Sequence, residues 1–285
     1  MNILVTGSSG FVGTHLCARL WKEHQNVFYL ARPHNFTQEL GSDGNTFFFA
    51  NNNIGALMLF LRQNQIEGII HLASLYLQSH QEKDIPDLIQ SNVYLGTAIL
   101  EAACKAGVKW FINTGTIWQN FNAPDGSDLY CPVNLYAATK QAFMNIAKFY
   151  SETTNIRICT LKLCDTYGPN DTRRKIYALF EENARNGELL KMSAGEQKMD
   201  ILHIDDVVDG FMHLTKMMHN GEELRDEYVL SSGNQLTLRE IAVKYEKEHN
   251  VQLNIEWGAR PYRTREVMTP YKGNVLPGWN PQKVI

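Results

Sequence analysis

The stretch that decides the fold lies at residues 1–13, and it reads Met1-Asn2-Ile3-Leu4-Val5-Thr6-Gly7-Ser8-Ser9-Gly10-Phe11-Val12-Gly13. Its first six residues are mostly apolar, which is typical of a buried parallel strand. Residues 15–21 have the apolar spacing of an amphipathic helix. The three glycines suit the turn between them, because they allow a tight bend, close approach of a diphosphate and close packing of helix on strand. We therefore predict a dinucleotide-binding turn, with the diphosphate held at the helix N-terminus.

The second predicted strand, residues 26–31, indicates which dinucleotide binds. NAD sites usually carry an acidic residue about 20 residues beyond the glycine loop, where it holds the ribose 2′-hydroxyl. Here the strand is followed by Arg32, with no carboxylate beside it. An arginine at this place pairs with a 2′-phosphate, so we expect NADP, with NAD as the alternative.

The first half of the chain alternates between strands and helices. We expect strands at residues 1–6, 26–31, 47–50, 68–73, 109–114 and 156–163, and helices at 54–63, 91–105 and 136–151. This order predicts an α/β fold, a Rossmann-type doubly wound parallel sheet that binds ligands at the C-terminal ends of its strands. Residues 1–166 are expected to form the dinucleotide-binding domain.

The pattern changes in the second half. Helices are expected at 175–186, from 205 onward and at 238–249, with short strands near 189–192, 200–204, 227–230 and 252–256. We predict that residues 167–285 form mostly a smaller α/β C-terminal lobe that binds the substrate. Residues 200–231 or so are expected to return and pack on the large sheet.

Composition excludes several other classes of protein. A net charge of −3 gives no electrostatic case for a nucleic acid polymer or an anionic membrane. No apolar run reaches the roughly 18 residues of a membrane-spanning helix. A core strand at the very start leaves no room for a signal peptide, and five cysteines without a CxxC pair indicate reduced thiols. We therefore expect a cytoplasmic protein.

No metal site is expected. The nine histidines are scattered and show no metal-ligand spacing. The nearest candidate, His203 with Asp205 and Asp206, is interpreted as a strand-to-helix junction with an acidic N-cap.

Tyr136 and Lys140 form a candidate catalytic pair. Their spacing of four residues on a predicted helix places both side chains on one face. A free tyrosine loses its proton near pH ~10, so at neutral pH it needs nearby positive charge to act as an acid or base. Lys140 and an oxidised nicotinamide would supply that charge. So short a motif gains its meaning from the glycine loop that precedes it.

These motifs resemble the extended short-chain dehydrogenase/reductase superfamily, in its nucleotide-sugar epimerase/dehydratase branch. The resemblance extends in the same order along nearly the whole chain: the glycine loop, residues 68–73, Asn92-Val93 with Gly96-Thr97, Tyr136 with Lys140, residues 161–169 and residues 203–207. Residues 113–116, 135–136 and 167–171 look closest to CDP-abequose and CDP-paratose synthases. Those enzymes reduce a 4-keto-3,6-dideoxyhexose bound to CDP.

The resemblance implies a role for particular residues. Tyr136 would exchange a proton with the sugar C4 oxygen, Lys140 would bind the nicotinamide ribose and lower the tyrosine pKa, and Thr116 would hydrogen-bond the same oxygen. The implied cofactor site comprises Gly7, Ser9, Gly10, Phe11, Val12, Gly13, Arg32, Asn51, Leu72, Ala73, Ser74, Thr114, Tyr136, Lys140 and Leu163. The implied substrate site comprises Tyr76, Thr116, Tyr136, Asp165, Lys198 and Arg260.

Departures from the family pattern narrow the chemistry. The 4,6-dehydratases follow their threonine with an Asp-Glu pair, whereas Ile117 and Trp118 follow Thr116 and cannot transfer protons. The cysteine that C3/C5 epimerase-reductases use just past this point is absent too, which leaves reduction or epimerisation at C4.

Two further departures concern substrate binding. Met199 stands where the family has an arginine that grips the nucleotide diphosphate, so Lys198 or Arg260 is expected to take that role. Asp165 replaces the family's asparagine, and its charge near a diphosphate requires a partner.

We therefore predict NADP-dependent reduction of the C4 keto group of a nucleotide-activated 6-deoxy or 3,6-dideoxy hexose, with a CDP-sugar favoured. The alternatives are an NAD-dependent nucleotide-sugar 4-epimerase, which Arg32 disfavours, and a non-catalytic dinucleotide-sensing regulator, which the retained Tyr136 and Lys140 disfavour. The resemblance also implies a homodimer formed through the helices at 91–105 and 136–151.

Overall fold

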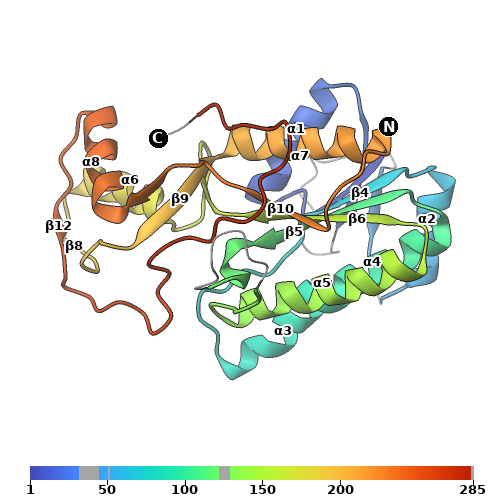
Figure 1. Ribbon diagram of the computed structural model, residues 1–285, viewed down its shortest axis with the longest axis horizontal. Helices are drawn as coiled ribbons and strands as arrows, with labels where there is room; N and C mark the ends of the chain where they lie inside the picture. The colour runs from blue at the N-terminus through green and yellow to red at the C-terminus, as the bar shows by residue number, and fades with distance from the viewer. Residues whose placement is uncertain (32–44, 51, 122–128, 284–285) are drawn as a thin grey trace.

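A seven-stranded parallel sheet forms the centre of the computed structural model, which describes residues 1–31, 45–50, 52–121 and 129–283 (Figure 1). Its strands, in spatial order, are β10 (Glu227–Leu230), β6 (Arg157–Leu163), β5 (Trp110–Thr116), β4 (Gly68–His71), β1 (Asn2–Thr6), β2 (Asn26–Ala31) and β3 (Thr46–Phe48). From β1 the chain runs outward to β2 and β3, and then crosses to β4, β5 and β6 on the other side. This reversal confirms the predicted doubly wound fold, and ligands bind such sheets beside the point of reversal.

Helices cover both faces of the sheet (Figure 1). On one face α1 (Phe11–Lys22) packs against α7 (Ile204–Asn220), and Leu16 and Phe211 belong to the same apolar core. The other face carries α2 (Ile54–Gln63), α4 (Leu95–Ala106) and α5 (Leu135–Thr153), packed around a second apolar core. No described helix has the length and apolarity needed to cross a membrane.

A smaller α/β unit lies at one end of the sheet, at the left of Figure 1. It contains a sheet of β7 (Asp165–Tyr167), β9 (Lys198–His203) and β11 (Gln235–Thr237), and a pair formed by β8 (Leu190–Lys191) and β12 (Ile255–Glu256). Its helices are α6 (Ile176–Asn186) and α8 (Leu238–His249), which pack around Phe180 and Tyr245. Between these elements, α7 and β10 belong to the large sheet and its cover.

The predicted helix at 91–105 begins differently in the structure. A short 3-10 helix, η1 (Glu82–Asp84), and α3 (Ile85–Ile89) precede it, and a π-helical turn, η2 (Gln90–Tyr94), joins α3 to α4. Pro86 occupies the first turn of α3, where its missing N–H costs no hydrogen bond. The predicted helix thus starts earlier and contains an irregular turn.

Short strands were the other difference. The strands β7 and β11 were not predicted, and the strand predicted at 252–256 is limited to Ile255–Glu256. Segments of two or three residues are too short for the alternation that marks a strand in sequence.

Candidate active site

The C-terminal ends of four strands meet where the predicted ligand site lies. Thr6 of β1 is in register with His71 of β4, His71 with Asn113 of β5, and Thr116 of β5 with Leu163 of β6. The loops that follow these strands therefore border one crevice.

The glycine turn after β1 has the shape that a diphosphate requires. Gly7 has a φ of +70°, and a Cβ there would lie 2.7 Å from the backbone nitrogen of Ala73. A Cβ on Gly13 would lie 2.1 Å from the carbonyl oxygen of Gly7. At Gly10 the nearest atom would be 3.2 Å away, and Gly10 and Ser9 are exposed, so the outer side of the turn is open. No described side chain caps the N-terminus of α1, which leaves the N–H groups of Phe11 and Val12 for an anion.

Other predicted cofactor residues border the same crevice. Leu72, Ala73 and Ser74 follow β4, and Leu163 ends β6. The Thr114 hydroxyl on β5 is buried and has no hydrogen-bond partner among the described residues, so a ligand group can satisfy it. Arg32 and Asn51 lie outside the described residues.

Tyr136 and Lys140 are one turn apart near the start of α5. Asn134 caps this helix by accepting a 2.9 Å hydrogen bond from the backbone of Ala137. Burial raises the pKa of Tyr136 to about 12, against the opposing effects of a hydrogen bond with Ser74 and the charge of Arg173. Burial likewise lowers the pKa of Lys140 to about 8. In the protein without cofactor, burial thus outweighs the charge of Arg173, and the lowering of the tyrosine pKa by Lys140 stays a prediction for the cofactor-bound enzyme.

A neutral histidine lies beside Lys140. His71 is buried, and burial together with the charge of Lys140 lowers its pKa to about 3. Its Nδ1 lies 2.8 Å from the hydroxyl of Thr6, which also accepts a 3.2 Å hydrogen bond from the backbone of Ala73. This network joins β1 to β4 below the crevice.

Thr116 ends β5 at the mouth of the crevice. Its hydroxyl oxygen accepts a 3.3 Å hydrogen bond from the backbone of Trp118, and its own N–H donates to Gln119 at 2.9 Å. The hydroxyl proton remains for a donated bond, the role that the family resemblance implies.

Asn92 supports this site, although its function could not be inferred from the sequence motif alone. It is buried in the π-helical turn η2, where its Oδ1 accepts from the Ser74 hydroxyl at 3.1 Å and from the Leu75 backbone at 2.7 Å. Its Nδ2 donates to the Leu75 carbonyl at 2.9 Å and to the Thr139 hydroxyl at 3.0 Å. Asn92 thereby fixes the loop after β4 against α5. A π-turn commonly marks a functional site.

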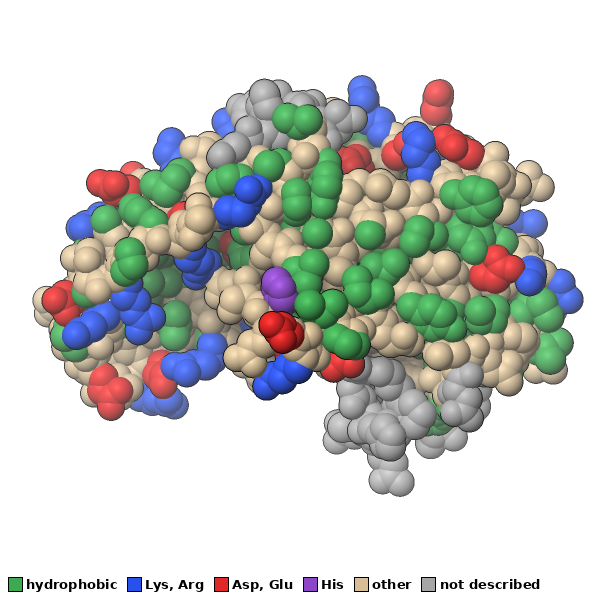
Figure 2. Space-filling model, turned by 90° about the horizontal axis from the view of Figure 1, so that it is seen from below, with side chains coloured by type: hydrophobic (Ala, Val, Ile, Leu, Met, Phe, Trp, Pro, Cys, Tyr) green, Lys and Arg blue, Asp and Glu red, His purple; other side chains and the backbone are tan. Residues whose placement is uncertain are grey.

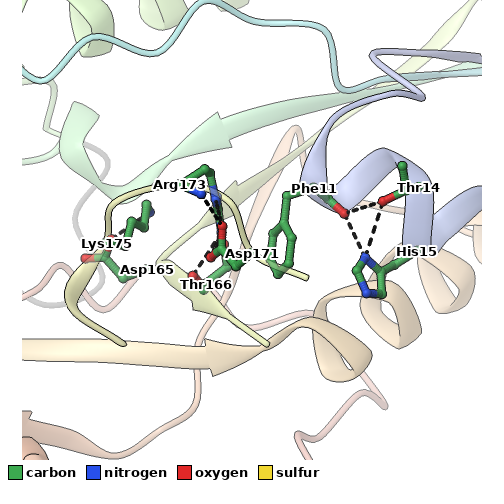
Figure 3. A network of polar contacts seen from close by, with 8 residues as sticks. All are labelled: Phe11, Thr14, His15, Asp165, Thr166, Asp171, Arg173 and Lys175. Carbon is green, nitrogen blue, oxygen red and sulfur yellow. Dashed lines mark hydrogen bonds and ion pairs between the residues drawn. The ribbon is translucent and has the colours of Figure 1, made fainter. Parts of the chain in front are cut away.

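Aromatic rings form one wall of the site. The Tyr76 ring lies edge-on to that of Tyr136, with centroids 5.1 Å apart, and 5.8 Å from that of Trp118. The ammonium group of Lys175 lies 5.7 Å from the Tyr76 centroid and 2.9 Å from the Asp165 carboxylate. Asp165 thus has the partner that its charge requires (Figure 3).

The remaining predicted substrate residues lie farther toward the surface. Lys198 begins β9 and is exposed, with its charge near Glu240, and Arg260 is exposed with its backbone bonded to Met192. Arg263, three residues later, reaches the site: its charge lowers the pKa of Tyr76, against the stronger raising effect of burial. Its guanidinium also contacts the side-chain amide of Gln78.

The junction at His203 differs from the prediction of an acidic N-cap. His203 itself caps α7, because its Nδ1 accepts a 3.1 Å hydrogen bond from the backbone of Asp205. Asp206 is buried and accepts hydrogen bonds from the backbones of Gln282 and Lys283 at 2.9 and 2.8 Å. Within the described residues, no cluster of His, Cys, Asp and Glu is able to hold a metal ion.

Comparison with known proteins identifies the family. The model of the NAD dependent epimerase/dehydratase family matches residues 3–230. The chain belongs to this family. It is an NAD(P)-dependent enzyme of the nucleotide-sugar epimerase/dehydratase type.

Relatives and solved structures agree with this membership. CDP-abequose synthase from Yersinia pseudotuberculosis is 28% identical to this epimerase/dehydratase-family protein over 274 residues, covering 95% of this chain and 92% of the relative. The Salmonella muenchen CDP-abequose synthase is 28% identical over 267 residues, covering 93% and 87%. MoeE5 in complex with UDP-glucuronic acid and NAD shares the fold with a TM-score of 0.82, 21% identity and coverage of 99% and 94%. UDP-glucose 4-epimerase from Thermotoga maritima, solved with UDP-glucose, shares the fold with a TM-score of 0.79 and 21% identity, covering 99% of this chain and 94% of that one.

Proposed function

We propose that this enzyme uses NADP to reduce the C4 keto group of a nucleotide-activated 6-deoxy or 3,6-dideoxy hexose, with a CDP-sugar as the favoured substrate. The observation that carries the proposal is the set of side chains at the strand ends: Tyr136 and Lys140 lie one turn apart on α5, and Thr116 ends β5 with the buried Ile117 after it. A phenol carries its proton at neutral pH, and burial raises the pKa of Tyr136 to about 12, so Tyr136 can serve as the proton donor that reduction at C4 needs.

The chain's own residues hold the carbonyl and supply the proton. NADP, when bound, supplies the hydride. The Tyr136 phenol donates its proton to the C4 oxygen, and the Thr116 hydroxyl donates a hydrogen bond that holds this oxygen in place. Lys140 adds positive charge beside the developing oxyanion and binds the nicotinamide ribose. The positioning of these groups and their charge account for the protein's share of catalysis.

The residues after Thr116 argue against elimination of water. Ile117 is buried and the Trp118 ring lies tilted beside that of Tyr76, and neither side chain has a group that can act as an acid or base toward the sugar. The CDP-abequose synthases among the relatives support a CDP-bound deoxysugar. Arg32, after β2, supports NADP over NAD.

Substrate contacts follow from the wall of the crevice. We infer that Tyr76, Thr116 and Tyr136 surround the sugar, and that Asp165 contacts a sugar hydroxyl while paired with Lys175. We infer that Arg263 is a further contact of the substrate, since its charge acts on Tyr76. Lys198 and Arg260 remain predicted contacts of the nucleotide diphosphate.

A homodimer is also proposed, formed through the face that carries α3 to α5. Figure 2 shows this side of the molecule, with hydrophobic side chains spread across it. Large hydrophobic side chains are exposed on these helices: Ile85 and Ile89 on α3, at 41% and 45%, and Phe149 on α5, at 59%. A second copy would cover them in a four-helix arrangement. A cytoplasmic location is inferred from the five cysteines, each of which is free.

The decisive experiment follows the absorbance of NADPH and NADH with a panel of CDP-, dTDP-, GDP- and UDP-linked 4-keto-6-deoxysugars. We expect NADPH to be consumed, fastest with a CDP-sugar. If no sugar consumes NADPH and the purified protein retains NAD, the reductase is excluded and the 4-epimerase is favoured. Binding of NAD or NADP without turnover of any nucleotide sugar would instead support the dinucleotide-sensing regulator.

A further inference from the structure

Arg173 lies where the small unit approaches the glycine turn. It belongs to the segment between β7 and α6, and its guanidinium carbon lies 4.2 Å from the centroid of the Phe11 ring. Phe11 is the first residue of α1, the helix whose N-terminus faces the predicted diphosphate. In Figure 3 the Phe11 ring lies between α1 and this segment, on the side toward Arg173.

Hydrogen bonds fix the orientation of this guanidinium. Nε and Nη2 each donate to the Asp171 carboxylate at 2.7 Å, in a forked pair. Nη2 also donates to the carbonyl and hydroxyl oxygens of Thr166, at 3.1 and 3.0 Å. On the other side of the Phe11 ring, His15 lies edge-on at 5.2 Å and bonds the Phe11 carbonyl at 2.9 Å. Both partners of the contact are therefore held in place.

These hydrogen bonds use only Nε and Nη2 of the guanidinium. No described residue accepts a hydrogen bond from Nη1, which carries two N–H groups. The side chain of Asp171 is 11% exposed, whereas that of Arg173 is 34% exposed, so the cation is more accessible than its carboxylate partner. The charge of Arg173 also acts on the phenols of Tyr136 and Tyr76. Arg173 thus contacts the first residue of α1, and its charge also acts on the proposed proton donor.

We propose that Arg173 binds the diphosphate of the dinucleotide through Nη1, and so connects the small unit to the bound cofactor. The N–H groups at the start of α1 contact the diphosphate from one side, and Arg173 contacts it from the other. A planar, permanently charged fork suits this task better than a lysine, because Asp171 and Phe11 can fix it while Nη1 still donates. The inference rests on the proposed function only in assuming a dinucleotide at the glycine turn.

A nucleotide sugar also carries a diphosphate, so the test must separate the two ligands. The contact with Phe11 favours the cofactor, since Phe11 begins the helix at the glycine turn. Calorimetric titrations of purified protein with NADPH, NADH, ADP-ribose or its 2′-phosphate, and CDP measure each affinity without any turnover. ADP-ribose has the diphosphate but no nicotinamide, and CDP represents the substrate.

We expect Arg173→Met to raise the Kd of the preferred dinucleotide roughly tenfold, the effect of losing one hydrogen bond from a charged group. The Kd of the ADP-ribose compound should rise by the same factor, and that of CDP should stay unchanged. Arg173→Lys keeps the charge and loses the fork, so it should give a smaller increase. Arg174→Met is the matched control: Arg174 is adjacent and 78% exposed, pairs with Glu182 on α6, and should leave every Kd unchanged.

Unchanged affinity for the dinucleotide in Arg173→Met would overturn the proposal, as would a rise in the Kd of CDP alone. Arg173→Lys provides the same readout if the methionine variant fails to fold, which thermal unfolding reveals. Since no sugar is present in these titrations, failure of the wild-type enzyme to reduce 4-keto sugars would contradict the proposed reaction without affecting this result.

Discussion

The carboxylate of Asp165 lies 2.9 Å from the ammonium group of Lys175, and each side chain is about one-quarter exposed, at 24% and 25%. Asp165, which stands where the family pattern has an asparagine, is therefore paired with the cation of Lys175. Lys175 also lies near the ring of Tyr76, so the pair borders the aromatic wall that Tyr76 forms with Trp118 and Tyr136.

Separate and joint removal of these two charges should reveal their coupling. We expect Asp165→Asn and Lys175→Met each to lower the free energy of unfolding, and the double variant to lose about 1 kcal/mol less than the two single losses together. Urea unfolding of the four proteins measures this. The exposed pair Lys148 and Glu152 on α5, 3.4 Å apart, is the control and should show almost no coupling. Equal coupling in both pairs would mean that Asp165 and Lys175 interact no more strongly than two surface charges.

The Tyr136 phenol should matter far more for turnover than for cofactor binding. Tyr136→Phe removes the proton donor, so kcat should fall by roughly 10²- to 10⁴-fold, while the Kd of the dinucleotide should rise by no more than about tenfold, the effect of losing one hydrogen bond. Tyr150→Phe tests the same change at the other end of α5, where the hydroxyl donates to Glu101 at 2.8 Å, and should keep normal turnover. A Tyr136→Phe enzyme with near-normal kcat would refute the assigned mechanism for reduction and epimerisation alike.

The buried charge of Lys140 should lower the free energy of unfolding at pH values below about 8. Its pKa is about 8 in the folded protein against 10.5 in the reference state, so the unfolded chain binds more protons between these values. Stability therefore rises with pH across this window, and below it the buried charge carries its full cost of about 3 kcal/mol. Lys140→Met should then be more stable than wild type at pH 7, by up to that amount.

The difference in free energy of unfolding between Lys140→Met and wild type should depend on pH. The stability gap between Lys140→Met and wild type should shrink at pH 9.5, where Lys140 is largely neutral, when both proteins are unfolded with urea free of dinucleotide. Lys148→Met, on the exposed side of α5, should show no such dependence. A gap of constant size would mean that Lys140 does not titrate near pH 8.

The large sheet was predictable because its signals are local and long. The strands β1, β2, β4, β5 and β6 are apolar runs separated by helices, and a central parallel strand needs such a run to be buried on both faces. The glycine turn and the spacing of Tyr136 and Lys140 are likewise properties of a few neighbouring residues. Each could be read without knowing what lies across the fold.

Two interactions beside the predicted site involve residues that are distant in sequence. Arg173 reaches Phe11 across more than half the chain, and Arg263 reaches Tyr76 from the tail. An arginine in a loop belongs to no periodic pattern of helix or strand. Nothing in the sequence therefore distinguishes Arg173 from its neighbour Arg174. The N-cap of α7 was mispredicted because Asp205 and Asp206 are better N-cap residues by type than His203, whereas the helix already begins at Ile204 and its N-cap is His203, two residues before Asp205.

Gly10 and Gly13 should separate cofactor binding from folding. A Cβ on Gly13 would lie 2.1 Å from the Gly7 carbonyl, with the backbone of Ser8 at 2.7 Å, so Gly13→Ala forces α1 away from β1 and should lower the thermal midpoint clearly. Gly10 has a φ of −80°, which alanine adopts freely, and its Cβ would meet only the Gly7 carbonyl, at 3.2 Å. Gly10→Ala should therefore keep a near-normal thermal midpoint.

That added methyl group would stand on the open side of the turn, where the diphosphate must approach the backbone. We therefore expect Gly10→Ala to weaken dinucleotide binding roughly tenfold or more in a calorimetric titration, although the protein stays folded. Gly55→Ala, near the start of α2, is the matched control, because its Cβ would have only the Asn53 side chain within 4 Å, at 3.6 Å. If Gly10→Ala bound the dinucleotide as tightly as wild type, the diphosphate would have to lie elsewhere than at this turn.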